Sequence, residues 1–207
     1  YQWEASVLNL AIKLLAEQHS VVSALNQQGR VGGEMITLSY VNQILWHGRV
    51  ARKQINGSPA EIQTAIESWR EAANESLDAT IVAYKVDEVS VGDYFAAIDS
   101  FAEAKLWLAR HQNNELRYLD ATYQWADMAL VTWSQVNALN QAGRVGGEAV
   151  NEALARLLCE AARVQFRNAS KASGKEPIYD RFATEWRRLE IARFQSKFRP
   201  TVKDWPP

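Results

Sequence analysis

The side chains that could perform metal or acid–base chemistry are few and far apart. His111 and Glu115 lie four residues apart, a spacing that would place two metal ligands on one face of a helix. Two ligands do not make a site, and a polar pair at the edge of a loop is the simpler interpretation. The repeated Glu-x-x-His pairs of di-metal helical bundles are absent. We therefore expect neither a metal nor a cofactor.

Candidate catalytic residues have no distinctive spacing either. The sequence lacks a Gly-x-Ser-x-Gly elbow, a Walker-type phosphate loop and a His-Glu-x-x-His pair. Paired carboxylates could serve hydrolysis, but solvent-facing helices explain the available acids as well, namely Asp87, Glu88, Asp99, Glu103 and Asp120. We assign no catalytic residue and lean towards a protein that is not an enzyme.

Arginine occurs twice in the same glycine-rich setting. Residues 21–36 read VVSALNQQGRVGGEMI and residues 135–150 read QVNALNQAGRVGGEAV, so 11 of 16 aligned positions are identical. Two matches of this length, 114 residues apart, indicate an internal duplication.

Each copy is predicted to form a tight corner between two antiparallel helices. A first glycine suits the left-handed position after a helix, a glycine pair prevents the helix from continuing, and a glutamate suits the first turn of the next helix. The corner residues are Gly29, Gly32, Gly33, Glu34, Gly143, Gly146, Gly147 and Glu148.

Arg30 and Arg144 have two interpretations. The glycine-rich backbone with an arginine could cradle an anion, although the nearby glutamate would repel a phosphate. The default is a local pairing of each arginine with the glutamate four residues on, which leaves a contact with a partner or a phosphate as the alternative.

A second group of basic residues lies near the C-terminus, where arginine and lysine alternate with aromatic residues. This pattern is typical of a surface for nucleic acid or an acidic partner, although arginine stems also cover apolar surface on terminal helices. The candidate binding residues are Arg187, Arg188, Arg193, Lys197, Phe198 and Arg199.

The elements that carry these residues are helices. Apolar residues recur every three or four positions, and alternating β-branched segments are absent, so we predict six or seven helices and no sheet. Two of the predicted packing stripes matter below. One comprises Trp3, Val7, Leu10, Leu14 and Val21, and the other Val150, Leu154, Leu157, Ala161 and Val164. Residues 168–176 are predicted to be a polar linker.

The duplication extends beyond the corners and suggests the domain organisation. Trp69-Arg70 matches Trp186-Arg187, and Arg49-Val50 matches Arg163-Val164. We therefore predict two three-helix units, joined by a bridging helix and packed as a single compact domain. Their boundaries are 1–85 for the first unit, 86–112 for the bridge, 113–199 for the second unit and 200–207 for an extended tail.

Composition sets further bounds. The 207 residues are 47% hydrophobic and carry a net charge of −1, so they can form a large core and do not suggest a globally basic nucleic-acid binder. Cys159 is the single cysteine, which excludes an internal disulfide framework. No segment is apolar enough for a membrane span. The chain opens at Tyr1 rather than Met, which is consistent with processing.

These features predict a non-enzymatic helical structural protein that self-assembles or binds a protein partner. One alternative is a coat-like assembly protein that associates with nucleic acid through the corner arginines and the C-terminal basic residues. Another is an enzyme with a site between the two units. We expect it in the cytoplasm or in an assembled particle rather than secreted.

Overall fold

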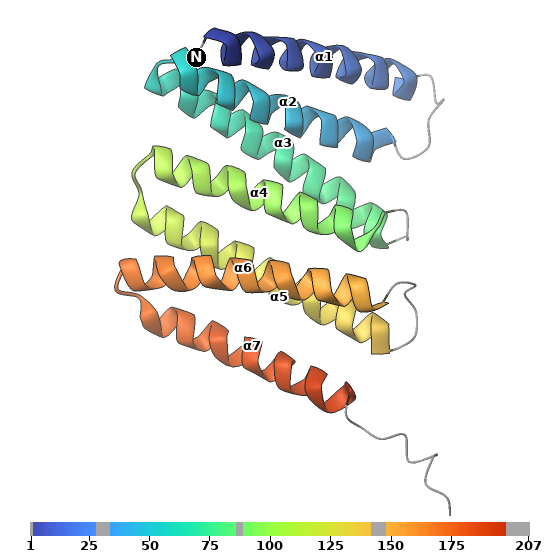
Figure 1. Ribbon diagram of the computed structural model, residues 1–207, viewed down its shortest axis with the longest axis vertical. Coiled ribbons are helices and arrows are strands. Elements are labelled where there is room, and N and C mark those ends of the chain that lie inside the picture. Colours follow the sequence, from blue (N-terminus) through green and yellow to red (C-terminus); the bar gives the residue numbers. More distant parts are fainter. Residues whose placement is uncertain (1, 28–33, 86–88, 142–147, 198–207) are drawn as a thin grey trace, which may run out of the picture. The chain divides into compact units, whose positions relative to one another are not determined.

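Helices make up nearly all of the chain that the structure describes (Figure 1). The computed structural model describes residues 2–27, 34–85, 89–141 and 148–197, and side chains at 2–4, 26, 34–37, 85, 139–141, 148–152 and 192–197 are left out of the description. The prediction of an all-α fold with six or seven helices is confirmed. The helices are α1 Gln2–Gln27, α2 Glu34–Asn56, α3 Pro59–Lys85, α4 Val91–His111, α5 Glu115–Gln141, α6 Glu148–Ala172 and α7 Glu176–Lys197.

Helix starts follow local capping chemistry. At the start of α3, the Ser58 hydroxyl accepts from the backbone N–H of Glu61 at 3.3 Å, and the Glu61 carboxylate accepts from the backbone N–H of Ser58 at 2.9 Å. Ser90 and Asp93 make the same reciprocal pair at the start of α4. Each pair satisfies backbone donors that a helix leaves free at its N-terminus.

The end of α6 corrects the predicted linker. Helix α6 continues to Ala172, so the connection is far shorter than residues 168–176. It closes with the Lys175 N–H donating to Ser170 O at 2.8 Å, and Gly174 takes a φ of +64°. A glycine adopts this left-handed conformation cheaply, which ends the helix without a long loop.

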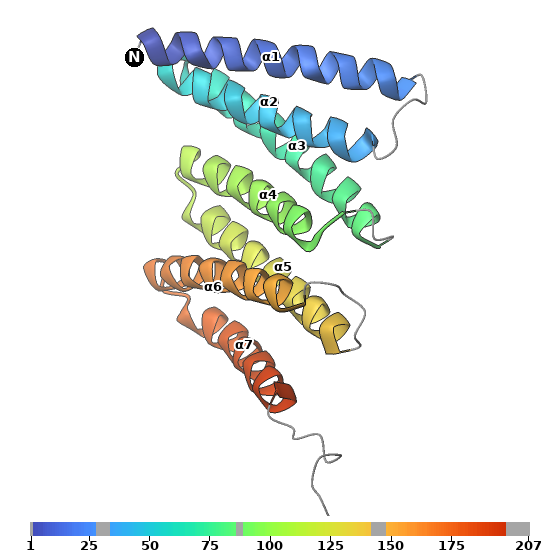
Figure 2. The same ribbon diagram turned by 45° about the vertical axis from the view of Figure 1, so that its right-hand side comes forward.

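The chain divides into two compact units, residues 1–125 and 126–207. In the first unit, each helix packs on the next along the chain: α1 on α2, α2 on α3, and α3 on α4. Figures 1 and 2 show this order from two directions, from the blue α1 to the green α4. The bridging helix and the start of α5 therefore belong with the first three helices.

The core of the first unit surrounds Trp69, whose side chain is completely buried. Ile66, Ala73 and Val50 are buried in the same cluster as Ala104 of α4. Helices α2, α3 and α4 therefore share one hydrophobic core, and large-to-small changes there are costly.

In the second unit, α6 and α7 pack through aromatic side chains. The ring of Phe166 meets the rings of Tyr179 and Phe182 edge-on, with centroids 5.8 and 5.5 Å apart. The Arg163 guanidinium lies 4.6 Å from the ring centroid of Trp186. Trp186 is half-buried, unlike Trp69. The two matched tryptophans therefore have different surroundings, and the duplication stays a prediction from sequence.

Most residues of the two predicted packing stripes are exposed, so these stripes are not the faces through which the helices pack; the side chains of Trp3 and Val150 lie outside the description. The α1 residues Val7, Leu10, Leu14 and Val21 are exposed, as are Leu157, Ala161 and Val164 of α6. Each helix instead packs through a neighbouring face. In α6 the buried residues are Ala155, Cys159, Ala162, Phe166, Ala169 and Ser170. The stripes were chosen for large aliphatic residues, but small ones allow the helices to approach.

Candidate functional site

The most distinctive surface of the first unit is the outer face of α1, defined here by Val7, Leu10, Leu14 and Val21. Their exposed fractions are 48, 58, 56 and 58%. The spacings of three, four and seven place them in one row along the helix. Isolated exposed aliphatic residues are ordinary, whereas a continuous row on one helix is typical of a contact surface.

The opposite face of α1 packs on α2. Gly48 of α2 permits the close approach, because a Cβ there would lie 3.3 Å from Cγ1 of Ile12. Arg52 Nε donates to Asn9 Oδ1 at 2.8 Å in the same interface. Helix α1 is therefore apolar on two sides, and the described residues cover one of them.

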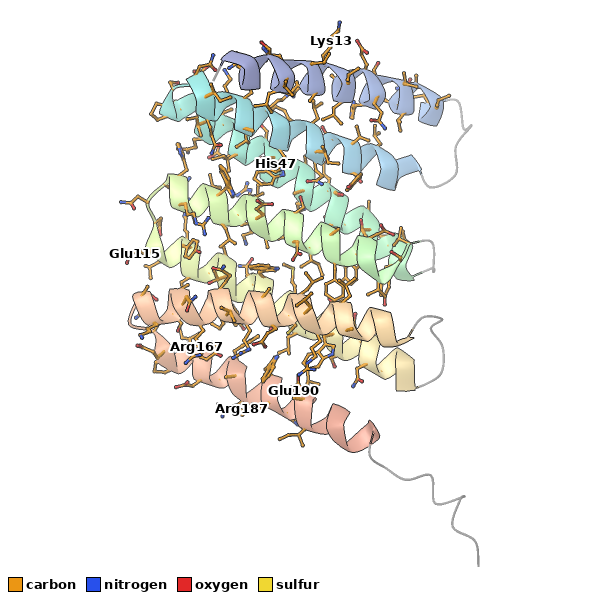
Figure 3. All side chains as sticks on the ribbon, viewed as in Figure 1. Lys13, His47, Glu115, Arg167, Arg187 and Glu190 are labelled. Atoms are coloured by element: carbon orange, nitrogen blue, oxygen red, sulfur yellow. The ribbon has the colours of Figure 1, made fainter. Side chains whose placement is uncertain are left out.

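Charged residues also lie on this side of α1. Lys13 Nζ lies 3.9 Å from Glu17 Oε1, and both side chains are largely exposed. Figure 3 shows Lys13 on the side of α1 that points away from α2. An exposed pair of this kind contributes little to stability, so both groups are available to other partners.

A pocket of about 620 Å³ lies where α1, α2 and α3 meet. Ile12, Trp46 and Ala65 supply apolar lining, one from each helix. The charged lining consists of Arg49, Arg52, Lys53 and Glu61.

Most of the pocket's charged groups have defined partners. Lys53 pairs with the Glu61 carboxylate, whose pKa is lowered to about 2 by hydrogen bonds from Lys53 and Ser58. Arg49 lies 4.3 Å from the ring centroid of Trp46. Arg52 Nη1 differs, because it is buried and has no hydrogen-bond partner in the described part of the chain.

The sequence alone does not reveal this pocket. Cations near the end of a helix, such as those of α2, are expected there simply because they suit the helix dipole. The signal that could have identified them is the spacing of Trp46, Arg49 and Lys53, which places three large side chains on one helix face. Their meeting with α1 and with the start of α3 is a tertiary feature.

The predicted C-terminal basic surface is described only in part. Arg187 and Arg188 are exposed on α7, and Arg188 lies 3.9 Å from Glu185. Between residues 176 and 191, three arginines stand among four acids, Glu176, Asp180, Glu185 and Glu190. This stretch is not basic overall. The side chains of Arg193, Lys197, Phe198 and Arg199 lie outside the description, so a nucleic-acid surface stays a prediction.

The predicted corners fall mostly outside the described residues. Helices α2 and α6 begin at Glu34 and Glu148. Arg30 and Arg144 lie outside the description, as do the six corner glycines, Gly29, Gly32, Gly33, Gly143, Gly146 and Gly147. The roles proposed for these arginines and glycines therefore stay predictions from sequence.

The other reactive residues have structural partners. His111 Nε2 lies 3.0 Å from Pro59 O, a contact in which the imidazole donates. Burial raises the pKa of the Cys159 thiol to about 12. Within the described ranges, no three His, Cys, Asp or Glu side chains gather as metal ligands. In the same ranges, no helix has the length and apolarity to cross a bilayer.

Comparison with known proteins adds no assignment. No family model, no curated protein and no solved structure matches this chain.

Proposed function

We propose that this chain is a non-enzymatic helical interaction protein that self-associates through the outer face of α1. The observation that carries the proposal is the row of Val7, Leu10, Leu14 and Val21, exposed on a helix that already packs through its opposite side. Covering such a row removes apolar surface from water, which is the main favourable term in association.

The spacing of the row fits a second helix as its occupant. Residues 7, 14 and 21 alternate with residues 10 and 17 in the three-four pattern by which two helices interlock along a shared seam. A second copy of α1 supplies the same pattern. One surface patch can then serve both partners about a twofold axis.

Glu17 favours antiparallel over parallel pairing. In a parallel pair, the Glu17 carboxylates of both copies would face each other and repel. An antiparallel pair can set Leu14 of each copy against Glu17 of the other. Lys13 of each copy can then pair with that carboxylate, which gives two ion pairs by symmetry.

Sedimentation velocity tests the proposal with the full chain from about 1 to about 500 µM, because an interface of one helix pair is small and binds weakly. The test variant is Leu10→Glu with Leu14→Glu. The matched control is Leu157→Glu with Val164→Glu, which places the same charges on the exposed row of α6.

We expect the wild type and the control to form dimers at high concentration, while the α1 variant stays monomeric with an unchanged circular dichroism spectrum. A wild type that is monomeric throughout contradicts the proposal. An assembly that persists in the α1 variant, or that dissociates in the control, also contradicts it.

A further inference from the structure

The pocket between α1, α2 and α3 has the size and lining of a small-molecule site. Its volume of about 620 Å³ lies within the usual range for ligand pockets. Its lining joins an indole and aliphatic side chains to a few polar groups. Such a site binds a molecule with an apolar body and one or two polar atoms, rather than a bare ion.

The charge of the lining selects an anion. Arg49, Arg52 and Lys53 face one acid, Glu61, which leaves a formal charge of +2. The ion pair with Glu61 occupies Lys53. The two arginines therefore supply the uncompensated charge. A guanidinium on an aromatic face, as Arg49 is on Trp46, retains in-plane N–H donors for carboxylate or phosphate oxygens.

Arg52 identifies where the anionic group would bind. Its Nε donates to Asn9, which fixes the guanidinium in the α1–α2 interface. Arg52 lines the pocket together with Arg49. A guanidinium held in place in this way keeps further N–H donors, and a carboxylate or phosphate oxygen is their strongest partner.

We infer that this pocket binds a small amphipathic anion, with its carboxylate or phosphate group on Arg52 and its apolar or aromatic body against Trp46 and Ile12. This inference is independent of self-association, because the pocket lies on the α2 side of α1.

Isothermal titration calorimetry with four probes tests the inference. The probes are 1-naphthyl phosphate, 1-naphthylacetate, neutral 1-naphthol and inorganic phosphate. We expect saturable one-to-one binding of at least one naphthyl anion, and the stronger of the two identifies the preferred anionic group. Naphthol and inorganic phosphate should each bind at least about tenfold more weakly, since naphthol lacks the anionic group and inorganic phosphate lacks the apolar body.

Variants assign the binding to the pocket. Arg52→Gln should weaken binding at least about tenfold. Thr64→Trp should abolish binding by filling the pocket while keeping every charge, since Thr64 is an exposed lining residue whose hydroxyl donates to Ala60 O within α3. Arg167→Gln, which removes an exposed arginine of α6, should bind like the wild type.

Four outcomes would overturn the inference. Neither naphthyl anion binds, naphthol binds as tightly as the anions, Thr64→Trp binds normally, or Arg167→Gln weakens binding as much as Arg52→Gln does. The Thr64 variant keeps the test valid even if loss of the Asn9 contact unfolds Arg52→Gln.

Discussion

Trp69 is the residue on which the packing of the first unit depends most. Its ring stacks on His47 with centroids 4.3 Å apart, and the edge of Trp107 meets it at 6.3 Å. Its Nε1 donates to Gln43 Oε1 at 3.4 Å, and the Ser100 hydroxyl donates to the same oxygen. One side chain thus links α2, α3 and α4, which explains why it is fully enclosed.

Truncation of Trp69 should therefore be severe. We expect Trp69→Ala to lower the free energy of unfolding by about 3–5 kcal/mol, because the vacated space cannot fully collapse. Trp186→Ala is the matched comparison and should cost less, since Trp186 is half-buried. Urea denaturation measures both values. A cost for Trp186→Ala equal to or above that for Trp69→Ala would show that burial does not set their contributions.

At this scale, the sequence indicates that Trp69 is buried but not what surrounds it. Ile66, Trp69 and Ala73 recur at spacings of three and four, which is typical of the apolar face of a helix, and Trp69 is buried there. The stack with His47 and the bond to Gln43 depend on the rotation of α2 against α3. No local pattern determines that rotation. The pocket around Arg52 was missed for the same reason, since three helices contribute to it.

At the scale of the elements, the sequence indicates where helices start, because the side chains that cap a helix are close to its first turn in the sequence. Ser58-Pro59 is a typical helix start, with serine as the N-cap and proline at the first position, and the Ser58–Glu61 pair completes the start of α3. The end of α6 could not be predicted from the sequence, because a polar segment can continue a helix as well as end it. Gly174 closes that helix at its positive φ.

Glu61 should make the stability of α3 depend on pH. Its folded-state pKa of about 2 lies below the ordinary value of 4.5, so its contribution is fully present above pH 4.5 and is lost as pH falls through 2. Glu61→Gln should lower the melting temperature at pH 7, and the difference from wild type should shrink steeply towards pH 2 and vanish below it.

The comparison needs a second glutamate on the same helix. Glu75→Gln, at an exposed position of α3, should leave the melting temperature near that of the wild type at both pH values. A Glu61→Gln difference that persists unchanged at pH 2 would show that the carboxylate charge is not responsible.

The row on α1 shows what periodicity alone leaves open. The sequence gives α1 two apolar faces, and only one of them packs on α2. Periodicity marks both as apolar without stating which one the chain itself covers. The exposed face became visible only with the neighbouring helices in place, and it is the basis of the proposed self-association.

At the scale of the whole molecule, the sequence predicted the helix order and the all-α class, since both follow from local patterns. It did not predict the division at residue 125, because contacts between helices decide it.

The proposed antiparallel pairing of two α1 helices is tested most directly by a distance between the two copies.

That measurement is the distance between nitroxide labels on Gln18→Cys and, separately, on Glu4→Cys in the dimer, by pulsed electron resonance. The native Cys159 is buried, and its thiol pKa of about 12 keeps it unreactive during labelling. With Leu14 set against Glu17, the axial offset is about 8 Å between the two copies of residue 18 and about 35 Å between those of residue 4. We therefore predict a short distance at Gln18 and a long one at Glu4. Equal distances at both positions, or no intermolecular distance at Gln18, would contradict the account.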